Sequence, residues 1–237
     1  MTSHDIDTLE RRALAFCLAA RLTAWPDDET WRSARALADG LSDGDDDERR
    51  LVALVDNLAE EGREGEYVSL FEHGATRVPI HETEFGRMRG MSKGNELADI
   101  AGFYAAFGMD RADSSAARQL HDHLAVELEF YGVLLAKEAA LTERGEAEGV
   151  EVVAAARKKF LADHLGRLAP AVASQPPVAQ NAAWGPVFDA CQKLVLAECR
   201  RVDVTPAPLD FVAGAAEPDE VCCGAPVSTA PAAVKPS

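Results

Sequence analysis

The chain has 237 residues, 47% of them hydrophobic and 27% charged, so it can bury a substantial core and has the composition of a folded globular protein. Forty acidic residues against 24 lysines and arginines give a formal net charge of −16, which argues against a nucleic-acid partner because phosphate binding needs clustered positive charge. The same charge favours a basic ligand, although a general role in solubility would explain it equally well.

The first predicted element is an amphipathic helix near the N-terminus. The stretch ERRALAFCLAARLTA has two adjacent arginines followed by eight apolar residues, as an export signal does. However, Asp5, Asp7 and Glu10 precede the arginines, where a signal carries net positive charge. Arg21 also interrupts the apolar run, and no stretch approaches the ~20 apolar residues of a membrane span. We therefore expect a folded helix, one side of which carries Leu9, Ala13, Phe16 and Ala20.

Helical periodicity recurs along the chain, whereas strict alternation of apolar and polar residues does not. The strand-like piece TRVPI contains Pro79, and the other such piece, VEVV, lies in a helical context. The sequence therefore predicts an all-α helical bundle of roughly eight or more helices, forming one domain over residues 1–205. Apolar residues spaced three or four apart indicate helices at residues 51–58, 97–107, 120–135, 161–168 and 184–198.

Two irregular segments separate these helices. Residues 42–48, SDGDDDE, space their aspartates like the start of a calcium loop, but Glu48 stands where glycine is required and Leu54 where the final glutamate belongs. We interpret this segment as a solvated loop whose acids cap the next helix. Residues 73–93 lack periodicity over roughly twenty positions, which in a compact domain is more often functional or mobile.

The composition changes from Pro206 onward. Six of the 12 prolines fall among the last 32 residues, together with alanine, glycine and serine, so residues 206–237 are predicted to form a flexible tail. Cys222 and Cys223 are adjacent in this tail, and nothing near them completes a metal site. Because five cysteines cannot all pair within the chain, a reduced, cytoplasmic protein fits best.

The stretch RQLHDHLAVELEF, residues 118–130, could be a metal site, an acid–base pair or a docking surface. His121 and His123 would point about 200° apart on a helix, whereas His123 and Glu127 share a face and could supply two ligands. A closed metal site needs more ligands, and no HExxH or CxxC motif provides them. A small metal-dependent hydrolase or redox protein using these three residues is therefore kept only as an alternative.

An acid–base pair in this stretch would need a nucleophile or a bound phosphate group on which to act. The chain has no serine or cysteine in a recognisable nucleophile elbow and no phosphate-binding GxxxxGK[ST] loop. A purely structural interpretation is stronger, in which Asp122 caps a helix and His123 pairs with Glu127. The docking interpretation depends on the rest of the chain.

Five stretches, in this order and spacing, resemble the TorD/DmsD/NarJ family of redox-enzyme maturation chaperones, and look closest to the branch that serves type II DMSO-reductase-like molybdoenzymes. They are EYVSLFEHG, VPIHETEFG, ELADIAGFYAAFGM, DHLAVELEFYGVLLAKE and FLADHLGRLAP, within a resemblance that runs from about residue 10 to 200. The resemblance implies an all-α binding protein rather than an enzyme, with no cofactor of its own. Such a protein holds the apo catalytic subunit of a molybdenum enzyme, often by its twin-arginine leader, until molybdopterin is inserted.

The resemblance also implies a site. Asp122 and His123 match the family's Asp-His pair, in a hinge loop that is associated with leader binding. The family pattern has Glu-Pro shortly before this pair, whereas this chain has Gln119, Leu120 and His121. Helices could exchange between two copies across this hinge, at residues 109–122, so the chain is expected to be a monomer or a helix-swapped dimer. Glu127 and Glu129 are candidates to replace the missing glutamate.

Other candidates for partner contact lie outside the Asp-His pair. Glu82 and Glu84 fall in the long irregular loop, and loops carry function on a rigid scaffold. Asp99 lies off the apolar stripe of its helix and should face solvent or a groove. Tyr67 and Phe71 match a family motif, although core packing is their stronger interpretation. A plain helical scaffold that binds a partner without any maturation role remains an open alternative.

Overall fold

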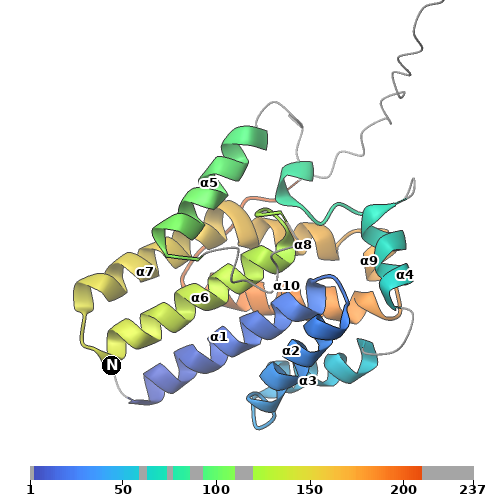
Figure 1. Cartoon of the computed structure of the whole chain (residues 1–237). Coiled ribbons are helices and arrows are strands. Elements are labelled where there is room, and N and C mark those ends of the chain that lie inside the picture. Colours follow the sequence, from blue (N-terminus) through green and yellow to red (C-terminus); the bar gives the residue numbers. More distant parts are fainter. Residues whose placement is uncertain (1–2, 59–62, 74–76, 86–92, 110–119, 210–237) are drawn as a thin grey trace, which may run out of the picture.

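The computed structural model describes residues 3–58, 63–73, 77–85, 93–109 and 120–209, and it is all-α, as predicted (Figure 1). None of the described helices is both long and apolar enough to cross a membrane. The described helical elements are α1 (Ser3–Thr23), α2 (Asp28–Asp39), α3 (Asp46–Leu58), α4 (Arg63–Tyr67), the π-helical turn η1 (Val68–Glu72), the 3₁₀ turn η2 (Glu82–Glu84), α5 (Lys93–Ala106), α6 (Leu124–Glu143), α7 (Ala147–Phe160), the π-helical turn η4 (Leu161–Leu165), α8 (Gly166–Ala173), α9 (Pro176–Ala179) and α10 (Trp184–Arg201).

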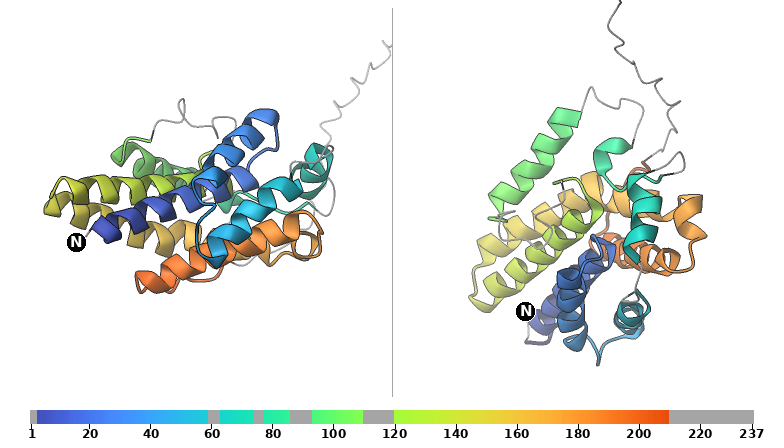
Figure 2. Two further views of the ribbon diagram at one scale, coloured as in Figure 1. Left: turned by 90° about the horizontal axis from the view of Figure 1, so that it is seen from below. Right: turned by 45° about the vertical axis from the view of Figure 1, so that its right-hand side comes forward.

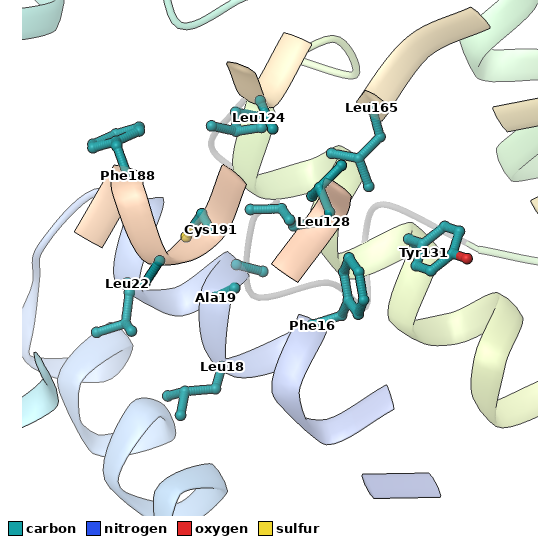
Figure 3. Packing of buried hydrophobic residues seen from close by; sticks show 14 of the residues in the cluster. Phe16, Leu18, Ala19, Leu22, Leu124, Leu128, Tyr131, Leu165, Phe188 and Cys191 are labelled. Atoms are coloured by element: carbon teal, nitrogen blue, oxygen red, sulfur yellow. The ribbon is translucent and has the colours of Figure 1, made fainter. Parts of the chain in front are cut away.

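Helices α1 and α6 lie side by side at the centre of the bundle (Figures 1 and 2). A β-carbon at Gly132 of α6 would lie 2.9 Å from Cys17 Sγ and 3.0 Å from the Ala13 carbonyl oxygen of α1, so only glycine allows this approach. Helix α6 is apolar on nearly all sides, and it is therefore buried between α1, α7 and η4. Figure 3 shows the core they share with α10, which includes Phe16, Leu128, Tyr131, Leu165 and Phe188.

The predicted N-terminal helix is confirmed as α1, with the expected face buried. Its two adjacent arginines hold other helices in place: Arg11 forms an ion pair with Glu48 at 2.7 Å, and Arg12 forms one with Glu198. The acidic loop caps α3 as predicted, because Asp45 Oδ1 accepts the backbone N–H groups at residues 47 and 48.

Helix α5 lies at the outer side of the bundle, next to α6 and α7 (Figures 1 and 2). Aromatic contacts hold α5 against α7 and α6. The ring centroid of Phe103 is 5.4 Å from that of Phe160 in α7, and the centroid of Tyr104 is 4.6 Å from that of Phe130 in α6. Most of the hinge predicted at residues 109–122 lies outside the described residues, so helix exchange stays a prediction.

The segment after α10 returns along α8 instead of leaving the bundle. Arg167 Nε donates a hydrogen bond of 3.2 Å to the Ala207 carbonyl oxygen. A β-carbon at Gly166 would lie only 2.6 Å from the Pro206 ring, so the two are in close contact. Residues 206 and 207 therefore lie against α8, whereas residues 210–237 of the predicted tail lie outside the described residues, so the tail boundary stays a prediction.

A candidate binding pocket beside the Asp-His pair

A pocket of about 490 Å³ opens beside the entry to α6. Its walls come from four parts of the chain: the loop between α1 and α2, the α4–η1 segment, the stretch before η2, and the loop that leads into α6. The walls are mainly apolar, and Leu120, two residues before Asp122, is 51% exposed. The lining residues are Trp25, Tyr67, Phe71, Glu72, Ile80, His81, Leu120 and His123.

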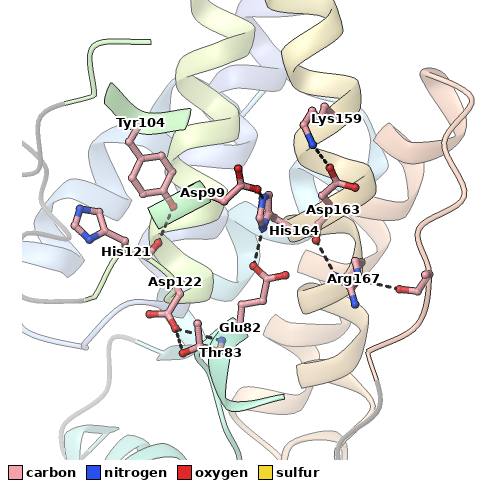
Figure 4. Close-up of polar contacts among 11 residues, drawn as sticks. Glu82, Thr83, Asp99, Tyr104, His121, Asp122, Lys159, Asp163, His164 and Arg167 are labelled. Carbon is pink, nitrogen blue, oxygen red and sulfur yellow. Dashed lines mark hydrogen bonds and ion pairs between the residues drawn. The ribbon is translucent and has the colours of Figure 1, made fainter. Parts of the chain in front are cut away.

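Asp122 lies behind this pocket and is fully buried. Its Oδ1 is 3.2 Å from His81 Nδ1, and its Oδ2 accepts hydrogen bonds from the Thr83 backbone N–H at 3.2 Å and the Thr83 hydroxyl at 2.5 Å (Figure 4). Burial alone would raise the pKa of Asp122, but the hydrogen bonds from His81 and Thr83 outweigh it and lower the pKa to about 2. Asp122 is therefore an ionised carboxylate that ties the segment before η2 to the start of α6.

His123, not the predicted Asp122, caps α6. Its backbone is extended, and its Nδ1 accepts the Ala125 backbone N–H at 3.0 Å. An N–H group can only donate, so the ring proton is on Nε2, which donates to Tyr67 Oη at 3.1 Å. The Tyr67 hydroxyl in turn donates to the Thr23 carbonyl oxygen at 3.3 Å. Burial lowers the pKa of His123 well below its usual range, so this ring is neutral.

The predicted pairing of His123 with Glu127 is wrong. Both carboxylate oxygens of Glu127 are buried, and neither has a hydrogen-bond partner among the described residues. Burial raises the pKa of Glu127 well above its usual range, and the negative charges of Glu82 and Asp122 raise it further. The alternative metal site is also not assembled, because both ring nitrogens of His123 are engaged. Within the described ranges, no group of three or more His, Cys, Asp or Glu residues is placed to hold a metal ion.

The buried Glu127 predicts an unusual pH dependence of stability. A carboxyl group whose pKa is higher in the folded than in the unfolded state destabilises the fold progressively as pH rises above its ordinary pKa of 4.5, by up to about 1.4 kcal/mol per pH unit until the folded-state pKa is reached. Glu127→Gln should therefore have nearly the wild-type free energy of unfolding at pH 4.5 and a higher one than wild type at pH 8. Urea unfolding at both pH values measures this difference, and an equal effect at the two would contradict it.

A second polar cluster, around His164, lies near Asp122 (Figure 4). His164 is buried between two acids: its Nδ1 is 2.9 Å from Glu82 Oε2, and its Nε2 is 3.3 Å from Asp99 Oδ2. Burial alone would lower the pKa of His164, but the hydrogen bond to Glu82 and the charges of both acids outweigh it and raise the pKa. Glu82, predicted to be available in a loop, is therefore turned inward.

The other predicted site residues fall into two groups. The Asp99 side chain is 57% exposed, as expected, and Glu84 lies near the surface in a bidentate pair with Arg77 at 2.6 and 3.2 Å. Tyr67 and Phe71 are buried, which confirms their core role, although both also line the pocket. Of the eight predicted residues, Tyr67, Phe71 and His123 line the pocket, whereas Asp122, Glu127, Glu82, Glu84 and Asp99 are not among its described lining residues.

Sequence reasoning missed the residues that face the pocket most directly. Trp25, Glu72 and His81 line it, and no periodic pattern marks them, because all three lie at helix ends or in irregular segments. His81 pairs with His123 as an isolated antiparallel bridge, which joins chain segments that are far apart in the sequence. Two local signals pointed to His81: the long irregular loop and the family-like stretch VPIHETEFG, both of which contain it.

Comparison of the sequence with known proteins identifies the family of this chain. The model of the family described as nitrate reductase delta subunit matches residues 29–174, more than half of the chain. The chlorate reductase assembly chaperone protein of Ideonella dechloratans is 29% identical over 168 residues, which cover 70% of this chain and 76% of that protein. The selenate reductase assembly chaperone protein of Thauera selenatis is 28% identical over 165 residues, with the same coverage. The chain therefore belongs to the nitrate reductase delta subunit family and, with it, to the redox-enzyme maturation chaperones.

Proposed function

We propose that this protein is a cytoplasmic chaperone that binds the apo catalytic subunit of a molybdopterin-containing oxidoreductase and assists cofactor insertion before export. Two relatives are named as assembly chaperones, one of chlorate reductase and one of selenate reductase. In this proposal the chain has no cofactor and performs no catalysis. The observation that supports it is the pocket of about 490 Å³ beside the Asp-His pair, whose walls are mainly apolar.

The pocket and the charge of the chain together suit a leader peptide. A twin-arginine leader has a basic end and an apolar segment, and the pocket offers aromatic and aliphatic walls on a protein of net charge −16. Surface charge would speed and orient the encounter, while burial of the apolar segment would contribute roughly 25 cal/mol per Å² before ordering costs. Among the described residues that line the pocket there is no serine, cysteine or lysine that could act as a nucleophile.

The test is the molybdenum content of the client enzyme in cells that have or lack this protein. We expect loss of the protein to leave the client polypeptide in place but to lower its molybdopterin content several-fold, with restoration when the gene is returned. An unchanged cofactor content would contradict the proposal and favour a plain helical scaffold instead.

A further inference from the structure

Helix α5 is attached to the bundle by a small set of side chains. Among its residues whose side chains the structure describes, only Ile100 and Tyr104 are buried. The Tyr104 hydroxyl donates a hydrogen bond of 2.7 Å to the His121 carbonyl oxygen, and Asp99 contacts His164 (Figure 4). An element with so small a buried face opens more readily than the core helices α1 and α6.

His164 joins three elements, because it lies in η4 and contacts both η2 and α5. Its Nδ1 is 2.9 Å from Glu82 Oε2 of η2, and its Nε2 is 3.3 Å from Asp99 Oδ2 of α5. A carboxylate only accepts hydrogen bonds, so both ring nitrogens can donate here only when the imidazole is doubly protonated. A neutral imidazole has a single N–H group and can satisfy only one of the two acids.

We infer that His164 is a pH-sensitive switch, which holds α5 against the bundle while its ring is charged and releases α5 when the ring loses a proton. The contact with Asp99 is the one that is lost, because it is the longer of the two and the Asp99 side chain is 57% exposed, whereas Glu82 is buried. The inference concerns the isolated chain and does not rest on the proposed function.

The other charged groups around this switch come from the elements packed against it. They are Lys159 and Asp163 on the same helical segment, Arg167 of α8, Glu127 of α6, and Asp122 before α6. Lys159 pairs with Asp163 and also attracts Asp99. Its hydrogen bond to Asp163 raises the pKa of Lys159 from the ordinary value of 10.5, so this attraction does not change between pH 6 and 9.

Glu127 contributes a second proton to the same equilibrium. The Tyr104 side chain of α5 faces the buried acids: burial raises the pKa of its hydroxyl well above the usual range, and the charges of Glu127, Glu82 and Asp122 raise it further. Burial likewise raises the pKa of Glu127, so its carboxyl group holds a proton under α5. Release of α5 takes Tyr104 away, admits water to Glu127 and allows it to ionise.

Both groups favour release as the pH rises. Burial alone would lower the pKa of His164, but the hydrogen bond to Glu82 and the charges of both acids outweigh it and raise the pKa. The stabilisation from His164 is therefore complete below its ordinary pKa of 6.5 and is lost as the pH rises through the higher value of the closed state. Glu127 acts in the same direction above its ordinary pKa of 4.5. Each group multiplies the opening constant by up to about tenfold per pH unit within its window.

The test is hydrogen–deuterium exchange of the full-length protein between pH 6 and 9, followed by mass spectrometry on peptides from α1, α5 and α6. The observed rate divided by the intrinsic rate at the same pH gives the opening constant. A released helix of 14 residues is marginal in water, so release appears as exchange of the α5 amides. We expect the opening constant of α5 to exceed those of α1 and α6 and to rise about tenfold or more from pH 6 to 9.

Asp99→Asn tests the switch directly. The asparagine amide can donate to Nε2 of a neutral His164, so the contact no longer needs a second ring proton, and the rise with pH should be several-fold smaller than in wild type. Asp163→Asn is the matched control, because it removes one negative charge from an exposed acid that pairs with Lys159 rather than with His164, and it should keep the wild-type rise.

Glu127→Gln removes the second proton and should also reduce the rise. Combined with Asp99→Asn, it should leave an opening constant of α5 that is nearly independent of pH.

Three results would overturn the inference: an opening constant of α5 equal to those of α1 and α6, a constant that does not rise with pH, or a rise that Asp99→Asn leaves unchanged. Asp99 has an exposed side chain, so its substitution does not threaten the fold, and thermal unfolding at pH 6 verifies this. A rise lost equally in Asp163→Asn would assign the pH dependence to general surface charge and overturn the role of His164.

Discussion

Glu198→Ala is expected to lower the free energy of unfolding by about 3–5 kcal/mol, the cost of leaving buried charges without their partner. Glu198 is 1% exposed, and its Oε1 accepts a hydrogen bond of 2.8 Å from Arg12 Nε. Its Oε2 accepts one of 3.0 Å from the Tyr131 hydroxyl and lies 3.6 Å from Arg157 Nη1. Helices α1, α6, α7 and α10 meet at this carboxylate, so its removal leaves the partly buried Arg12 and the buried Arg157 guanidinium groups with less compensating charge.

Urea unfolding followed by circular dichroism measures this cost. The matched control on the same helix is Asp189→Ala, which removes an exposed ion pair with Lys193 at 2.6 Å and should cost no more than about 0.5 kcal/mol. If Glu198→Ala were no more destabilising than this control, the buried network would not be a main stabiliser of the bundle.

Trp184→Ala should also cost about 3–5 kcal/mol, because it removes a large, fully buried side chain and leaves a cavity. Trp184 stands behind the pocket wall, with its ring centroid 5.4 Å from that of Tyr67 and 6.4 Å from that of Phe71. The substitution should therefore weaken peptide binding as well, although Trp184 does not line the pocket.

The control for this prediction is Trp184→Phe. The indole Nε1 is buried and has no hydrogen-bond partner among the described residues, so its removal forfeits no hydrogen bond. The phenylalanine variant should recover most of the stability lost in the alanine variant. Equal losses for the two, measured in the same unfolding experiment, would mean that the indole itself and not the filled volume is required.

The buried faces of the long helices were predictable from local pattern. Apolar spacing along α1 identified Leu9 and Phe16 as core residues, and both are buried. The start of α6 was not predictable in the same way. Periodicity extended that helix back to Leu120, but His123 is extended, because the backbone at Ile80 accepts the Leu124 N–H at 3.1 Å. That bond joins residues 44 positions apart, which no local window contains.

The sequence by itself determined the helical class of this protein, its acidic charge and its family, since each depends on residue types and their spacing along the chain. Only the tertiary structure decided which polar residues face a ligand and which support the fold. Asp122 and His123 match the family's Asp-His pair but are buried, while His81, which was not a predicted site residue, lines the pocket. The reason is physical: whether a side chain is solvated or desolvated depends on the segments that pack over it, and here those segments are distant in the chain.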